Sequence, residues 1–243
     1  MFNKCFVLVA ILLPFALFSQ TKPKTFTVKF IDDIIKVDGI LDEEAWEASE
    51  SASEFHQYFP SDTTLAAQQT DIRMVYNNTT LYVSIRLKTE GNDFVIPSLK
   101  RDYRAGGNDN ISLMFDTFND GTNAFLFGMN PYGVRREALI SNGGSDTNGF
   151  TTSWDVKWQG EAKIYDGYYI CELAIPLTSF KFRQGETKWR FNSYRFDMQT
   201  NETSTWMKIP QNQRVFNLAF MGDMVFEKPL GKSRTPMALI PYV

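Results

Sequence analysis

The feature that most constrains the fold is a two-residue alternation of apolar and polar side chains that recurs along the chain. Residues 81–88 are the clearest case, because Leu81, Val83, Ile85 and Leu87 all fall on one side. Successive side chains of a β-strand point to opposite faces, so this period predicts a strand with one buried face. Similar segments predict strands at residues 25–31, 71–76, 111–116, 123–129, 134–140, 156–164, 168–175, 188–198, 203–208 and 218–226.

Turn-forming residues separate many of these segments. Residues 77–79, residues 119–121 and Asp166-Gly167 each lie between two predicted strands, and Asp-Gly is typical of a two-residue hairpin turn. Helical stretches are expected only at residues 42–49 and 176–180. Short strands joined by tight turns predict an all-β fold, namely an antiparallel, jelly-roll-like β-sandwich with one or two short helices.

The N-terminus has the composition of a secretory signal peptide. Lys4 precedes an apolar run over residues 6–18, which is shorter than the about 20 residues that a membrane-spanning helix needs. Residues 1–20 are therefore predicted to be a cleaved signal peptide, and the mature chain is predicted to be exported.

Removal of the leader leaves a composition that excludes several classes of function. Only Lys4 is lost among the charged residues, so the formal net charge changes from −3 to −4, which argues against a nucleic-acid partner. Cys5 is also lost, so Cys171 has no partner for an internal disulfide and is expected to be a buried thiol. His56 is the only histidine, which excludes a multi-histidine metal site and a histidine-based catalytic triad.

Six segments, in this order, resemble the family 9 carbohydrate-binding module. They are residues 37–46 (VDGILDEEAW), 71–76 (DIRMVY), 81–84 (LYVS), 108–116 (NDNISLMFD), 167–176 (GYYICELAIP) and 217–222 (NLAFMG). The resemblance covers about residues 26–226. It implies a domain that binds a poly- or oligosaccharide without cleaving it, in the service of carbohydrate catabolism.

Four further segments are similar to a narrower subgroup, in which such a module precedes a bacterial outer-membrane barrel. They are residues 100–102, 115–120, 129–134 and 153–158. This resemblance implies a module at residues 21–228, a linker or tail at residues 229–243, and association with an outer-membrane barrel. The location it implies is the periplasm, outer membrane or cell surface of a Gram-negative-type bacterium.

The chain departs from the family pattern at the ligand site. Sugar-binding members clamp a terminal sugar between two tryptophans, but the matching positions here are Gly106-Gly107 and residues 211–214, which contain no aromatic residue. Substitute ligand-binding residues are therefore expected nearby, with Trp154 as a stacking surface and Arg195 and Asp109 as hydrogen-bonding partners. The predicted ligand-binding residues are Trp154, Arg195, Asp109, Tyr103 and Trp206.

Aspartates in the predicted loops leave two interpretations open. Asp109, Asp116, Asp120 and Asp155 can gather at one end of a sandwich, where oxygen-rich loops bind calcium. The alternative interpretation is that these carboxylates cap turns, and the lack of a contiguous calcium loop in the sequence favours it. Asp116 and Asp155 are the candidate ligands if calcium is a cofactor.

Three function classes remain after the sequence is considered. The first is a non-catalytic glycan-binding module, and the second is a structural accessory domain of an outer-membrane barrel protein, truncated or split, without sugar affinity. The third is a hydrolase acting on O-glycosyl compounds, which needs two carboxylates about 5–10 Å apart across a cleft. No residue of the sequence is assigned a catalytic role.

The leader supports a direct prediction about the mature chain. We expect intact-mass analysis of the exported protein to give a chain that begins near Thr21, because the apolar run is a signal-peptide core. Recovery of a chain that retains Met1 in the cytosolic fraction would contradict the prediction.

Overall fold

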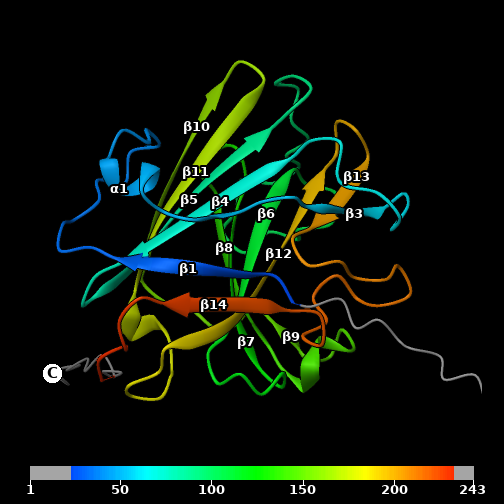
Figure 1. Cartoon of the computed structure of the whole chain (residues 1–243). Helices are drawn as coiled ribbons and strands as arrows, with labels where there is room; N and C mark the ends of the chain where they lie inside the picture. Colours follow the sequence, from blue (N-terminus) through cyan, green and yellow to red (C-terminus); the bar gives the residue numbers. More distant parts are fainter. Residues whose placement is uncertain (1–22, 233–243) are drawn as a thin grey trace, which may run out of the picture.

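The computed structural model describes residues 23–232, and its architecture is a β-sandwich (Figure 1). The described part contains one α-helix, α1 (Glu44–Glu47), the 3-10 helices η1 (Asn142–Gly144) and η2 (Leu177–Ser179), and 14 strands. The strands are β1 (Thr25–Phe30), β2 (Ser51–Ala52), β3 (His56–Phe59), β4 (Thr70–Tyr76), β5 (Thr80–Lys88), β6 (Asn110–Asp116), β7 (Ala124–Met129), β8 (Arg135–Ile140), β9 (Phe150–Thr151), β10 (Gln159–Tyr165), β11 (Tyr168–Pro176), β12 (Lys188–Asp197), β13 (Glu202–Thr205) and β14 (Gly222–Phe226). The predicted signal peptide at residues 1–20 and residues 233–243 of the predicted tail lie outside the described residues.

Strand β1 connects two facing sheets. Its first part, from Thr25 to Val28, pairs in parallel with β14, while Lys29 and Phe30 pair in parallel with β4. The first sheet therefore has the order β10-β11-β5-β4, and the second has the order β14-β12-β6-β7-β8-β9. In Figure 1, β1 and β14 lie side by side across the front of the molecule. All other pairings of named strands are antiparallel, so the predicted antiparallel sandwich is confirmed except at β1.

The three predicted turns are confirmed. Asp166-Gly167 joins β10 to β11 as a two-residue turn. Residues 77–79 join β4 to β5, and there the Asn77 side chain accepts hydrogen bonds from two backbone N–H groups. Residues 119–121 lie between β6 and β7, where Gly121 has a φ of 69°, a conformation that glycine adopts without steric cost.

The helical expectations and the shortest strands differ from the structure. The helix expected at residues 42–49 is confined to the single turn α1, and the stretch at residues 176–180 contains only η2. Strands β2, β3 and β9 were not expected. They have two to four residues each, which is too few to show a two-residue period.

An aromatic core fills the space between the sheets. Phe115 on β6 is fully buried and its ring centroid is 5.3 Å from that of Phe191 on β12. Trp189, also on β12, meets Phe226 of β14 edge to face at 4.9 Å. Cys171 is buried in this core, as expected. Burial of each such ring stabilises the fold by about 1.5–3 kcal/mol, so these contacts hold the two inner faces together.

The folded unit extends past the boundary expected at residue 228. Leu230 is only 3% exposed and packs in the core. Its backbone N–H donates to the Glu186 carbonyl at 2.8 Å, and its carbonyl accepts from Gly185 at 2.9 Å. The residue therefore belongs to the sandwich rather than to a linker.

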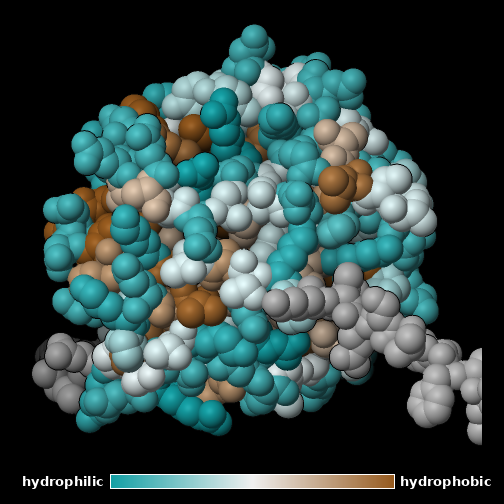
Figure 2. Space-filling view, in the orientation of Figure 1, coloured by the Kyte–Doolittle hydropathy of each residue, from teal (hydrophilic) through white to brown (hydrophobic). Residues whose placement is uncertain are grey.

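Apolar clusters also cover parts of both outer faces. On the second sheet, Met114, Leu126 and Tyr194 form a cluster against which Phe216 packs. On the first sheet, Tyr82 belongs to a cluster with residues of the segment that leads into α1. In the view of Figure 2 the surface is mostly hydrophilic, with apolar residues in small separated patches. No helix within residues 23–232 is long and apolar enough to cross a membrane.

A buried carboxylate fixes one of these covering segments. Glu172 on β11 is fully buried, and its Oε2 accepts hydrogen bonds from the backbone N–H groups of Asp38 and Gly39 at 2.9 and 3.0 Å. Gly39 has a φ of 75°, and a Cβ there would lie 2.9 Å from the Cβ of Lys163, so only glycine fits. Burial raises the pKa of Glu172 to about 7.

This carboxyl group should make stability depend on pH. The folded state retains the Glu172 proton between the ordinary pKa of 4.5 and about 7, while the unfolded state has released it. The free energy of unfolding should therefore fall as pH rises through this window. Glu172→Gln carries no titrating proton and should reduce the fall, which thermal or denaturant unfolding at several pH values measures. An unchanged pH dependence in the variant would contradict the prediction.

Candidate functional site

The base of the candidate site is a row of residues that crosses four neighbouring strands of the second sheet. Tyr194 on β12 pairs with Ser112 on β6, Ser112 pairs with Gly128 on β7, and Gly128 pairs with Arg136 on β8. A Cβ at Gly128 would lie 2.9 Å from both the Arg136 side chain and the Ser112 hydroxyl. Because glycine has no side chain, Arg136 can extend across β7.

The arginine makes polar contacts along this row and lies between aromatic rings. Its Nη1 donates to the Ser112 hydroxyl and the Tyr194 hydroxyl, each at 3.1 Å. Its guanidinium carbon is 5.8 Å from the Tyr103 ring centroid and 5.5 Å from that of Phe150. Arg136 is 3% exposed, and its Nε has no hydrogen-bond partner among the described residues. An unpaired buried donor of this kind is rare in a native structure and marks Arg136 as a candidate functional residue.

A cavity of about 240 Å³ opens next to this arginine. It lies between the loop before β6, the segment leading into β9, strand β12 and the turn before β14. The lining residues are Ala105, Gly106, Arg136, Thr147, Phe150, Tyr194, Phe196, Val215 and Phe216. The cavity thus combines apolar and aromatic walls with one buried cationic donor.

One part of the lining is aromatic. The rings of Phe150 and Phe216 lie 5.3 Å apart and form an aromatic wall. Gly106 also lines the cavity, and a Cβ there would meet no atom within 4 Å, so the space around it is open. The site therefore offers an aromatic surface and has no ring at the Gly106 position.

Of the predicted ligand-binding residues, the structure places only Tyr103 beside this cavity. Tyr103 is 4% exposed, and burial raises its pKa, so the hydroxyl stays protonated. Trp206 is 2% exposed, and its ring packs in the core against Phe26 at 5.4 Å and Phe191 at 5.5 Å. A ring so enclosed has no face for a ligand, and the proposed role of Trp206 is corrected to core packing.

Arg195 and Asp109 also have structural partners. Arg195 is 2% exposed and projects from β12 to the first sheet, where it donates to the carbonyls of Gln68 at 3.1 Å and Lys88 at 2.7 Å. It also forms a buried ion pair with Asp197 at 2.9 Å. Asp109 accepts backbone hydrogen bonds at both oxygens, and burial raises its pKa. These two residues connect chain segments and do not line the cavity.

Trp154 lies on the other side of β7 from the arginine row. Its half-buried ring packs against Phe125 at 5.3 Å and Phe127 at 5.6 Å, both of which belong to the central core cluster. Leu126 and Gly128, the alternate residues of β7, face the arginine row. Trp154 is therefore not part of the cavity at Arg136.

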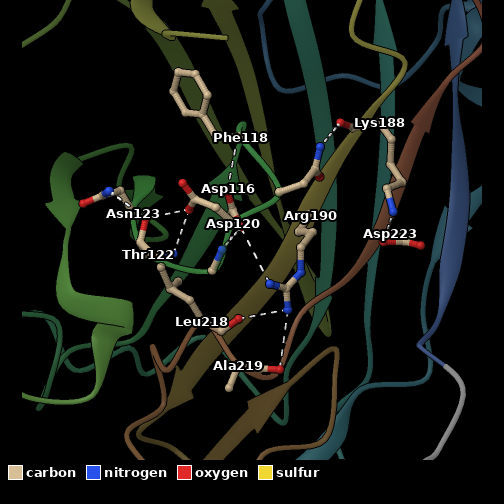
Figure 3. A network of polar contacts seen from close by, with 12 residues as sticks. Asp116, Phe118, Asp120, Thr122, Asn123, Lys188, Arg190, Leu218, Ala219 and Asp223 are labelled. Atoms are coloured by element: carbon tan, nitrogen blue, oxygen red, sulfur yellow. Dashed lines mark hydrogen bonds and ion pairs between the residues drawn. The ribbon is translucent and has the colours of Figure 1, made fainter. Parts of the chain in front are cut away.

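The two candidate calcium ligands belong to different contact networks. Asp116 is fully buried, accepts from the backbone N–H groups of Phe118 and Gly121, and lies 3.8 Å from Arg190 (Figure 3). Asp155 is paired with Arg101 at 3.1 Å. Within residues 23–232 no three histidine, cysteine or acidic side chains gather as a metal site would require. Asp116 therefore fits the interpretation as a turn-stabilising carboxylate, Asp155 is an ion-pair partner, and the two do not form a calcium site among the described residues.

The sequence contained signals for the residues that were missed. Arg136 falls on the same face of its predicted strand as Ala138 and Ile140, and an arginine on an apolar face needs an explanation. Gly128 lies inside a predicted strand, where glycine often marks a close approach of other atoms. Phe150 lies on the two-residue strand β9 and Phe216 in a loop, and neither gave such a signal.

A buried role for Arg195 predicts a loss of stability on substitution. Arg195→Ala leaves Asp197 and two carbonyls without their donor, so the free energy of unfolding should fall by about 3–5 kcal/mol. Urea unfolding measures the change, and the exposed Arg104→Ala serves as control, with an expected change within about 0.5 kcal/mol. A stable Arg195→Ala variant that fails to bind glycan would restore its predicted ligand role.

Comparisons with known proteins agree with this architecture. A family 9 carbohydrate-binding module of Caldicellulosiruptor kristjanssonii in complex with cellotriose is 13% identical, with a TM-score of 0.59, over 90% of this chain and 100% of that one. The structure of a module from the same organism with glucose gives 13% identity and a TM-score of 0.56, over 88% and 99% of the two chains. A candidate carbohydrate-binding protein of Bacteroides uniformis is 13% identical to this chain, with a TM-score of 0.64, over 85% of this chain and 100% of that one. At such low sequence identity, the structural similarity shows that the fold is shared.

The family assignment rests on sequence. No curated protein matched the chain. The family described as carbohydrate family 9 binding domain-like matches residues 37–227, which is most of the chain and includes every strand that builds the cavity. The chain belongs to the carbohydrate family 9 binding domain-like family.

Proposed function

We propose that this chain is a non-catalytic glycan-binding module and that the cavity at Arg136 is its sugar site. The observation that carries the proposal is the buried Arg136 side chain, which lines a cavity together with the aromatic wall formed by Phe150 and Phe216. Sugars present hydroxyl groups that accept hydrogen bonds from a guanidinium, and C–H faces that pack on aromatic rings. The structural neighbours hold cellotriose and glucose, which supports the same ligand class for this chain.

The size of the cavity limits the ligand. Its volume of about 240 Å³ is below the about 300–1,000 Å³ of pockets for drug-sized ligands, so it suits one sugar ring. No ring stands at the Gly106 position, so the lining supplies a single aromatic wall to a bound sugar. We expect weak affinity, with a free energy of binding of about −4 to −6 kcal/mol, or a Kd from about 1 mM to tens of micromolar.

We include the export, the catabolic role and the cellular location of the protein in the same proposal. The leader at residues 1–20 supports export, and the family association with polysaccharide-degrading systems supports a role in carbohydrate catabolism. The segments at residues 100–102 and 153–158 support association with an outer-membrane barrel. The proposed location is the periplasm, outer membrane or cell surface.

Two other functions make different demands on the site. A hydrolase acting on O-glycosyl compounds needs a pair of carboxylates, whereas the described lining of the cavity contains no acidic residue. A structural accessory domain needs no sugar contact, and the missing ring at Gly106 is the observation that favours it.

Titration with glucose and cellotriose, followed by NMR or calorimetry, tests the proposal. We expect Phe216→Ala to weaken binding by about tenfold or more, because it removes half of the aromatic wall. Phe59→Ala is a matched control, since this phenylalanine is 43% exposed and is not among the lining residues. Failure of the unmutated protein to bind any sugar on a glycan array would leave the accessory-domain function.

The same titration can also test a variant that should bind sugar more tightly. Gly106→Trp adds a ring to the lining that already holds Phe150 and Phe216, in space that is empty around the glycine. We expect tighter binding than in the unmutated protein, because a further ring adds aromatic surface on which a sugar can pack. Equal or weaker binding by a folded variant would count against this location.

A further inference from the structure

A second cavity, of about 520 Å³, lies on the outer face of the first sheet, away from the site proposed above. Tyr82 of β5 and Ala174 of β11 supply part of its lining, and Ile34 and Ile35 approach from the segment that follows β1. Tyr82, Ala174 and Ile35 belong to one buried apolar cluster. One side of this cavity is therefore apolar.

Other lining residues of this cavity are cationic and come from separate parts of the chain. Arg101 comes from the long loop before β6, Arg135 from the start of β8, and Lys157 from the segment before β10. Asp155 is the only acidic residue in the described lining, and its side chain is 83% exposed. This part of the lining is thus rich in hydrogen-bond donors.

One nitrogen anchors Arg101. Its Nη2 contacts Glu137 and Asp155, the latter at 3.1 Å, and also donates to the Val156 carbonyl at 3.1 Å. Its Nε and Nη1 have no hydrogen-bond partner among the residues that the structure describes. The guanidinium is held in place and still presents unused N–H groups.

Arg135 is anchored in a similar way. Its Nη1 donates to the Trp158 carbonyl, and its guanidinium carbon lies 5.5 Å from the centroid of the Trp158 ring. The Trp158 indole N–H donates to the buried Glu137 at 3.2 Å, so Glu137 is linked to both arginines. Nε and Nη2 of Arg135 are without a partner in the described part of the chain.

These contacts define the chemistry that the cavity can recognise. Three cations against Asp155 and Glu137 leave an excess of one positive charge. Guanidinium groups match the geometry of a carboxylate, and anchored ones lose little conformational entropy on binding. An inorganic anion can use the cations but not the apolar side formed by Tyr82 and Ile35. A carboxylate attached to a ring can use both.

We propose that this second cavity binds a uronic acid residue of an acidic glycan. Its carboxylate lies against Arg101 and Arg135, with Lys157 adding charge, and its ring packs toward Tyr82 and Ile35. The segments at residues 100–102 and 153–158, which contribute nothing to the lining of the Arg136 cavity, meet at this position through the Arg101–Asp155 pair. The chain then has two sugar sites of different charge preference with no lining residue in common.

The test is an NMR titration of the full mature chain with D-glucuronate, D-glucose and inorganic sulfate. We expect glucuronate to shift the Trp158 indole resonance, with a Kd that rises with salt, and glucose to leave this resonance unchanged. Arg135→Gln and Lys157→Gln should each weaken glucuronate binding by about tenfold or more. Arg183→Gln removes the same charge from an exposed position elsewhere and should bind as the unmutated protein does.

Several outcomes would overturn the proposal. Sulfate that shifts the Trp158 resonance as strongly as glucuronate would show an unselective anion site. Equal glucuronate binding by folded Arg135→Gln and Lys157→Gln variants, as checked by circular dichroism, would place binding elsewhere. The Phe216→Ala variant separates the two sites, because it should lose glucose binding and retain glucuronate binding.

Discussion

Burial of an aromatic layer between two twisted sheets is the interaction on which the rest of this structure depends. Strands β6 and β12 point three aromatic side chains inward, namely Phe115, Trp189 and Phe191. Because successive side chains of a strand point to opposite faces, the neighbours of these residues point outward. Two links hold the layer closed: β1 pairs with both sheets, and Arg195 reaches from β12 to carbonyls of the first sheet. The sheets therefore cannot separate without breaking hydrogen bonds as well as apolar contacts.

The same alternation explains why ligand chemistry is found on the outer faces. Inward positions of the second sheet are occupied by core rings, so the polar row from Tyr194 to Arg136 faces outward, under the loops around Phe150 and Phe216. Gly128 is essential to this row, because any side chain there would occupy the path of Arg136. On the first sheet, the segment held by Glu172 covers part of the outer face and contributes to a second cavity.

The two proposed sites differ in the way the protein preorganises its donors. At the first, one buried arginine lies among aromatic rings, which suits a neutral sugar that needs few hydrogen bonds. At the second, Glu137 is linked to two arginines that keep unused N–H groups, which suits a carboxylate. A module with one aromatic wall in place of a two-sided clamp is expected to bind weakly, and a second site on the same chain raises avidity for a glycan that reaches both.

The sequence alone determined the longer strands, three of the turns and the family, because each depends on neighbouring residues or on ordered local motifs. The alternation at residues 81–88 and the Asp166-Gly167 turn are examples that the structure confirms. The site was not determined in this way. Trp206 and Arg195 were predicted to bind ligand because their residue types suit that role, yet both face the interior. Only the tertiary structure decided that Arg136 and Phe216, which are far apart in sequence, share one cavity, because strand register and loop packing are set by long-range contacts.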